Sequence, residues 1–255
     1  MSEQAARIRS YFDGEAPQYA REREHQFSFN AQRRIALELL PRAMQRVLDV
    51  GCGPAVMADS LLGRAGEYCG IDISPRMIAE GCARLRRHPA GGRAHLVIGD
   101  ADSLAFAEHF FDAVVSLGVL EYLVTYERAL GEIWRVLRPG GIVVLAVPNR
   151  TSAYHRALRV TNRTRAEVKR LLGRQPRRSE VFAWNPCVPR RLDRKLARAG
   201  FSDLQGRCCN FIFHPLHELH AGASLALNRW LSARAPERLA PWLGTQYLVR
   251  AVKRA

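Results

Sequence analysis

The stretch Val47–Pro54, which reads Val-Leu-Asp-Val-Gly-Cys-Gly-Pro, decides how the rest of the chain is organised. Its apolar run is typical of a strand buried on both faces, and a helical pattern begins soon after Pro54. Gly51 and Gly53 allow a sharp turn without a Cβ that would keep a ligand away. The stretch therefore predicts a strand, a tight turn and a helix, at the kind of strand end where open α/β sheets hold nucleotide-like ligands.

Strand and helix patterns alternate on both sides of this turn. Helices are predicted at 30–40, 55–63, 74–85, 125–137 and 185–200. The predicted strands lie at 47–50, 67–73, 94–100, 111–117, 142–147, 205–213 and 246–252. This alternation is typical of an α/β fold in which a doubly wound, Rossmann-like, mostly parallel sheet of seven strands carries helices on both faces.

The chain of 255 residues shows no internal repeat and no low-complexity linker, so we expect one domain. Its four parts are predicted to be an N-terminal helical cap at 1–45, a cofactor-binding core at 46–148, a basic insertion that forms a helical lid at 149–186, and C-terminal strands with a substrate-side helix at 187–255.

Positive charge dominates the composition. The formal net charge is +15, and only three of the 39 basic residues are lysines. This excess predicts attraction to an anionic substrate, partner, nucleic acid or membrane surface, although arginine richness can also arise without a function. The insertion at 149–186 carries the densest arginine run.

Cysteine spacing and the N-terminus bear on location. The six cysteines show no paired metal-ligand spacing, so no metal site and a reduced, cytoplasmic chain are expected. The start of the chain lacks the layout of a signal peptide, and no apolar run reaches the roughly 20 residues that cross a bilayer. Peripheral contact with a membrane stays compatible with the sequence, which does not specify an oligomeric state.

Polar residues end the next predicted strands. Asp72 follows the second strand about 20 residues after the glycine turn, where Rossmann-type folds place a carboxylate that accepts both ribose hydroxyls. Asp100 ends the third strand, and Ser116-Leu117-Gly118 ends the fourth. Each acid could instead cap the helix that follows it. Because the carboxyl ends of parallel strands share one edge, we expect these residues to lie together.

Five motifs in this order resemble the class I S-adenosylmethionine-dependent methyltransferases. The resemblance covers about 45–148 and rests on these segments: Val-Leu-Asp-Val-Gly-Cys-Gly, Gly-Ile-Asp-Ile-Ser-Pro-Arg-Met, Gly-Asp-Ala-Asp-Ser-Leu, Phe-Asp-Ala-Val-Val-Ser and Leu-Arg-Pro-Gly-Gly. It implies S-adenosylmethionine as cofactor and methyl transfer as the activity. A nicotinamide-dependent enzyme would instead need a third glycine in G-x-G-x-x-G, where this chain has Val56.

The resemblance also implies roles for residues at the methionine end of the cofactor. The backbone at Gly51 and Gly53 is expected to pass close to the methionine part. Asp49 would help to orient the amino group, and Ser116 would approach the methionine part through its backbone.

A second set of implied roles concerns the nucleoside. Asp72 would bind the ribose, and Ile73 and Met77 would pack on the adenine. Asp100 would accept a hydrogen bond from the adenine amino group, and the amide of Ala101 would donate one to the ring.

The methyl acceptor is less defined. The fourth strand lacks the Asn/Asp-Pro-Pro-aromatic motif of enzymes that act on DNA bases, and the chain most resembles methyltransferases of quinones, lipids and natural products. We therefore expect an O- or C-acceptor in a small hydrophobic or anionic molecule. Two alternatives are an RNA-directed enzyme that uses the arginine-rich lid and a catalytically silent cofactor-binding partner protein. Nucleic acid is the less favoured ligand, because the lid lacks interleaved aromatic residues for stacking.

His214 is the candidate catalytic base, because it follows the predicted sixth strand at its carboxyl end. His155 is a weaker candidate, and Glu121 is interpreted as a residue at a helix start. The acceptor is accordingly expected between His155 and His214. The N-terminal aromatic residues either pack on the flank of the domain, which we favour, or cover a ligand cleft; they are Tyr11, Phe12, Tyr19, Phe27 and Phe29.

Overall fold

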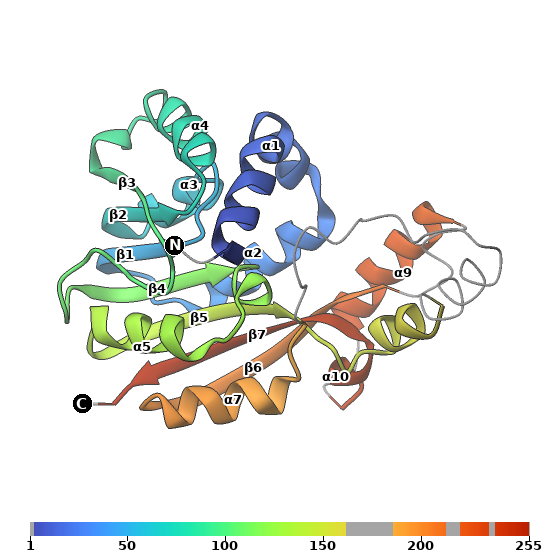
Figure 1. The fold of residues 1–255 in the computed structure, drawn as a ribbon. Coiled ribbons are helices and arrows are strands. Elements are labelled where there is room, and N and C mark those ends of the chain that lie inside the picture. The colour runs from blue at the N-terminus through green and yellow to red at the C-terminus, as the bar shows by residue number, and fades with distance from the viewer. Residues whose placement is uncertain (1–2, 162–185, 213–219, 235–237, 255) are drawn as a thin grey trace.

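The computed structural model of the chain describes residues 3–161, 186–212, 220–234 and 238–254. Its centre is a seven-stranded sheet in the order β3-β2-β1-β4-β5-β7-β6, in which β7 alone runs antiparallel to its neighbours (Figure 1). The strands are β1 Met44–Val50, β2 Ala65–Asp72, β3 Ala94–Ile98, β4 Phe111–Leu117, β5 Leu137–Pro148, β6 Phe201–Phe211 and β7 Gly244–Lys253. The predicted doubly wound, mostly parallel sheet is confirmed.

Helices cover both faces of this sheet. The α-helices are α1 Glu3–His25, α2 Phe27–Leu39, α3 Ala58–Leu62, α4 Pro75–Leu85, α5 Glu127–Val136, α7 Pro189–Arg198, α9 Ala221–Arg234 and α10 Ala240–Leu243. Short 3₁₀-helices lie at η1 Gly91–Arg93 and η2 Leu120–Tyr122, and 153–161 is also helical. The lid predicted at 149–186 lies mostly outside the described residues, because 162–185 are not described.

Two hydrophobic cores explain why the central strands are apolar throughout. Leu48 packs with α5 and α7 on one face, whereas Val47 packs with α2 and α3 on the other. Neither side chain is exposed to solvent. Because successive residues of a strand point to opposite faces, a strand that is covered on both faces reads as a continuous apolar run.

Strand β5 begins at Leu137, earlier than the predicted start at 142. Its pairing with β4 shifts register between Phe111 and Ala113, so the extra residues of β5 form a bulge. Gly140 lies in this bulge with a φ of 74°, a conformation that glycine adopts without strain. The Leu-Arg-Pro-Gly-Gly motif is therefore an irregular strand start.

Helix α1 lies across the carboxyl edge of the sheet, beside α4 (Figure 1). The Ser74 hydroxyl at the N-cap of α4 donates to Oδ1 of Asp13 over 2.6 Å. At the N-terminal end of α1, Nε2 of Gln4 donates to the carbonyl of Tyr122 over 2.6 Å. These two contacts fix α1 over the ends of β2 and β4, where the sequence predicts the ligand site.

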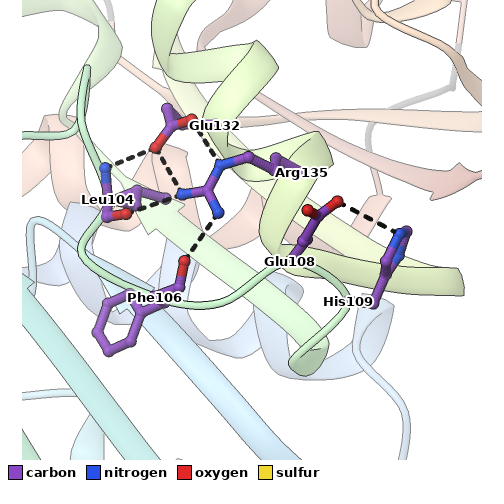
Figure 2. Close-up of polar contacts among 6 residues, drawn as sticks. All are labelled: Leu104, Phe106, Glu108, His109, Glu132 and Arg135. Carbon is purple, nitrogen blue, oxygen red and sulfur yellow. Dashed lines mark hydrogen bonds and ion pairs between the residues drawn. The ribbon is translucent and has the colours of Figure 1, made fainter.

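A charged pair on α5 holds the loop between β3 and β4. Figure 2 shows the guanidinium of Arg135 pointing to the carbonyls of Leu104 and Phe106, each 2.8 Å away, and to the carboxylate of Glu132. Glu132 in turn accepts from the amide of Leu104 over 2.8 Å. The loop that begins with Asp100 is thereby fastened to α5.

We predict that Arg135→Gln lowers the free energy of unfolding by about 2 kcal/mol, because it removes charge-assisted bonds to two carbonyls. The matched control is Arg128→Gln on the same helix, whose exposed side chain makes none of these bonds. Chemical denaturation monitored by circular dichroism measures both. A control that destabilises as much as Arg135→Gln would contradict the role of the pair.

Candidate functional site

A pocket opens at the carboxyl ends of β1, β2, β3 and β4. Counting its open mouth, it holds about 880 Å³ of empty space, a size suited to a nucleoside-sized ligand. Most of the residues predicted to bind a cofactor line it, namely Gly51, Gly53, Asp72, Ile73, Met77, Asp100 and Ala101. The structure thus brings together residues from three strand ends that are far apart in sequence.

The glycine turn needs glycine on steric grounds. Gly51 and Gly53 have φ values of 73° and 52°, which other residues rarely adopt. A Cβ on Gly51 would come within 2.1 Å of Cγ2 of Val119, in the segment after β4. The glycine turn therefore packs closely against the segment after β4, and residues of the turn and of this segment line the pocket.

Asp72 ties the turn to the second strand. Its Oδ2 accepts from the amide of Gly53 and its Oδ1 from the amide of Ser74, each over 2.9 Å. Burial raises the pKa of Asp72, while these two amides favour the ionised form and oppose the rise. Each carboxylate oxygen can accept a further hydrogen bond, so the side chain can receive two vicinal hydroxyls while the amides hold it in place.

The third strand supplies a second acidic wall. Oδ1 of Asp100 accepts from the amide of Asp102 over 3.0 Å, which turns the chain sharply beside Ala101. Oδ1 of Asp102 is buried and has no hydrogen-bond partner among the described residues. A backbone hydrogen bond from Ala129 at the start of α5 also acts on this carboxyl group, so its buried oxygen is not presented to a ligand in the pocket. Asp102 had no predicted role from the sequence.

Two predicted residues lie behind the pocket wall. Asp49 is 3% exposed and accepts from the hydroxyl of Tyr68 over 3.0 Å. Burial raises its pKa to about 7, against the lowering effect of that hydrogen bond. Ser116 is buried as well, and the following residues Leu117 and Gly118 line the pocket in its place. The approach predicted for Ser116 is through its backbone, and the roles predicted for Asp49 and Ser116 stay predictions.

Helix α1 roofs the pocket, contrary to the expectation that its aromatic residues pack on the flank. Phe12 and Tyr19 line the pocket, and their rings meet edge to face with centroids 6.1 Å apart. Phe12 also meets Tyr122 edge to face at 5.3 Å. Phe12 and Tyr19 therefore cover a ligand cleft, which was the second of the two expectations from the sequence.

A second chamber adjoins the first. It holds about 920 Å³ with its open mouth counted and is lined by Tyr11, Phe12, Glu15, Tyr19, Glu22, Arg23, Gln26 and Tyr122. Phe12, Tyr19 and Tyr122 line both hollows, so these aromatic side chains lie where the two meet. The sequence carried no signal for this chamber, because it forms only when α1 packs against η2.

Glu121 is a buried acid close to Gly118 in the wall of the first pocket. It is 6% exposed, and its Oε2 has no hydrogen-bond partner in the part of the chain that the structure describes. Burial raises its pKa to about 7, opposed in part by the positive charge of Arg23. A Cβ on Gly118 would lie 3.4 Å from Oε1 of Glu121, so the carboxyl group lies directly behind the pocket wall.

Of the two candidate histidines, His155 lies within the described residues. His155 is buried, and its Nδ1 lies 2.8 Å from the carbonyl oxygen of Asn149. Burial lowers the pKa of His155, so it is a neutral ring that braces the end of β5. His214 lies outside the described residues.

Neither a cluster of metal ligands nor a membrane-spanning helix occurs among the described residues. They contain no group of three or more His, Cys, Asp or Glu side chains placed to hold a metal ion. Their six cysteines are all free. No helix in the described ranges is both long and apolar enough to cross a bilayer.

Sequence comparisons place the chain among methyltransferases. A family model described as a methyltransferase domain matches residues 48–145. Demethylmenaquinone methyltransferase of Thermus thermophilus is 39% identical over 120 residues, which are 46% of this chain and 54% of that protein. Ubiquinone biosynthesis O-methyltransferase of Azorhizobium caulinodans is 31% identical over 184 residues, which are 71% of this chain and 67% of that protein. The matches span about half to two thirds of these relatives.

Solved structures share the fold. A SAM-dependent methyltransferase of Thermotoga maritima superposes with a TM-score of 0.64 at 18% identity, covering 97% of this chain and 100% of that chain. Phosphoethanolamine N-methyltransferase 2 of Haemonchus contortus, in complex with S-adenosyl-L-methionine, gives a TM-score of 0.58 at 19% identity, covering 89% of this chain and 53% of that chain. At these identities the likeness concerns the fold alone.

We predict that Gly51→Ala destabilises the chain by about 2 kcal/mol or more, because the new Cβ meets Val119 and the positive φ is strained. The matched control is Gly131→Ala in α5, where nothing lies within 4 Å, and it should stabilise by about 1 kcal/mol. Thermal and chemical denaturation measure both changes.

Adding Val119→Ala to Gly51→Ala should restore part of the lost stability, because it removes the methyl group that the new Cβ meets. If Gly51→Ala alone is as stable as the unsubstituted protein, the close packing of the turn is refuted.

Proposed function

The chain belongs to the class I S-adenosylmethionine-dependent methyltransferases, and on that premise we propose that it transfers the methyl group of S-adenosylmethionine to a small molecule. The observation that carries the proposal is the pair of adjoining hollows, one lined by the glycine turn and two acidic strand ends, the other by aromatic residues of α1. A methyl donor and a methyl acceptor need two such spaces in contact.

The residues of the first pocket fit the cofactor. Asp72 suits the ribose hydroxyls, and the adenine would lie between the apolar Ile73 and Met77 with its amino group near Asp100. The methionine end would then lie along Gly51 and Gly53, as the family resemblance implies. When bound, S-adenosylmethionine supplies an electrophilic methyl group on a sulfonium.

The second chamber is the proposed acceptor site. Its walls of Tyr11, Phe12, Tyr19 and Tyr122 suit a flat, apolar ring, and its charged residues are Arg23 and the acids Glu15 and Glu22. The guanidinium of Arg23 lies 4.8 Å from the ring centre of Tyr19 and is held by Gln26 over 3.1 Å. We infer a flat aromatic acceptor. This replaces the expectation that the acceptor binds between His155 and His214.

The names of the relatives agree with such an acceptor. They include a ubiquinone biosynthesis O-methyltransferase and a ubiquinone/menaquinone biosynthesis C-methyltransferase, the latter 38% identical over 106 residues. A quinone precursor or a similar phenol, methylated at oxygen or carbon, is therefore the proposed substrate. The open acceptor chamber beside the cofactor pocket favours an enzyme over a silent cofactor-binding protein. The cytoplasmic location expected from the sequence remains a prediction.

Glu121 is the proposed source of negative charge at the methionine end. Its carboxyl group lies behind Gly118, has an oxygen with no described partner and titrates near neutral pH. Ionised Glu121 would attract the positive sulfonium through the thin pocket wall, where the low dielectric strengthens the interaction. Glu121 therefore acts as a positioning residue for the methyl donor.

We predict that Asp72→Ala weakens binding of S-adenosylmethionine about 10- to 100-fold, because it removes the acceptor for the ribose hydroxyls. Asp72→Asn should lose less, since one oxygen remains. The matched control is Asp59→Ala, which removes an exposed acid outside the pocket. Isothermal titration calorimetry measures all three. Unchanged affinity in Asp72→Ala, or tight binding of NADH, would refute the assignment.

A second prediction concerns pH. Because the pKa of Glu121 is about 7, its carboxyl group is neutral below that pH and ionised above it. Affinity for the positive S-adenosylmethionine should therefore rise between pH 6 and pH 8, whereas affinity for the uncharged sulfur of S-adenosylhomocysteine should change less. In Glu121→Gln this difference between the two ligands should disappear. The proposed role fails if Glu121→Gln keeps the unsubstituted protein's pH dependence.

A further inference from the structure

A hollow lined mainly by arginine lies away from both ligand chambers. Its walls come from the end of β5, the helical residues 153–161 and the start of α7. With its open mouth counted it holds about 440 Å³. The lining residues are Arg150, Thr151, Arg156, Arg159, Val188 and Arg191, which we name the arginine hollow. In Figure 1 the yellow helix at 153–161 follows β5 on the right of the molecule.

The backbone around the arginine hollow is firmly fixed. The amide of Arg150 donates to the carbonyl of Cys187 over 2.9 Å, and the amide of Cys187 donates to the carbonyl of Pro148 over 3.0 Å. The side-chain amide of Asn149 donates to the carbonyl of Pro241 over 2.8 Å, which brings α10 against the same strand end. The positions from which the arginine side chains extend are therefore set by the fold.

The four guanidinium groups have no acidic partner within the ranges that the structure describes. Other arginines do pair, for example Arg207 with Glu38 over 2.8 Å and Arg250 with Asp203 over 2.6 Å. A general excess of arginine would scatter such groups over the surface, whereas here four like charges converge on one hollow and repel one another. An anion that enters the hollow would relieve this repulsion.

Exposed apolar side chains adjoin the arginine hollow. The guanidinium of Arg156 lies 5.4 Å from the ring centre of Trp242, which is 57% exposed. Val160 is 62% exposed and lies one helical turn from Arg156, beside Arg159. A tryptophan and an aliphatic side chain beside arginines are typical of a surface that rests on the headgroup region of a membrane.

We propose that the arginine hollow binds the phosphate of an anionic phospholipid headgroup, with Trp242 and Val160 resting on the membrane surface. Arg156 and Arg159 contact the phosphate from one helix, and Arg150 and Arg191 approach it from the end of β5 and the start of α7. A soluble phosphate would gain nothing from the exposed apolar residues. Single-stranded RNA would need several aromatic side chains for stacking, whereas Trp242 is the aromatic residue that contacts the hollow's arginines in the described structure.

Co-sedimentation with vesicles tests the proposal. The full chain should bind vesicles that contain phosphatidylglycerol and not vesicles of phosphatidylcholine alone. The double variant Arg156→Gln/Arg159→Gln should bind about 25-fold more weakly, at about fivefold per arginine. Trp242→Ala should also weaken binding. Circular dichroism and the melting temperature check that each variant is folded.

The matched control is Arg86→Gln/Arg87→Gln, which removes the same charge from exposed positions after α4. Equal loss of vesicle binding in both double variants would overturn the proposal, because it would show attraction by net charge alone. The proposal is also overturned if inorganic phosphate or single-stranded RNA binds through Arg156 and Arg159 while vesicles do not.

Discussion

The pocket at the carboxyl edge of the sheet depends on one carboxylate, that of Asp72. It accepts hydrogen bonds from the amides of Gly53 and Ser74. The first bond joins the glycine turn after β1 to the end of β2. The second fixes the N-cap of α4, whose Ser74 hydroxyl in turn holds α1 through Asp13. A buried acid with two amide donors thus organises the floor and, through Ser74, the roof of the pocket.

The sequence predicted the floor of the pocket well and the roof poorly. Strands buried on both faces leave continuous apolar runs, and a turn without space for a Cβ leaves glycine, so both features are visible in a linear pattern. The role of Phe12 and Tyr19 depends on the contact between Asp13 and Ser74, which are distant in sequence. Asp49 was predicted to help orient the amino group of the cofactor, and the hydrogen bond that it accepts from Tyr68 on the neighbouring strand could not be read from the sequence.

Positive charge is used in different ways over the molecule. Arg135 is built into the fold by Glu132 and two carbonyls, and Arg23 adds charge to the proposed acceptor chamber. The arginine hollow gathers charge without a described acidic partner, away from both chambers. The net charge of +15 therefore does not indicate a single function. Only the position of each guanidinium, which the composition cannot supply, separates a structural arginine from one available to a ligand.

A crystal structure of the chain with S-adenosylhomocysteine tests the central claim most directly. The account predicts both ribose hydroxyls on Asp72, the adenine beside Ile73 and Met77, and the sulfur pointing toward the three aromatic side chains that lie where the two chambers meet. Ligand bound elsewhere, or bound with Asp72 turned away from the ribose, would contradict the account.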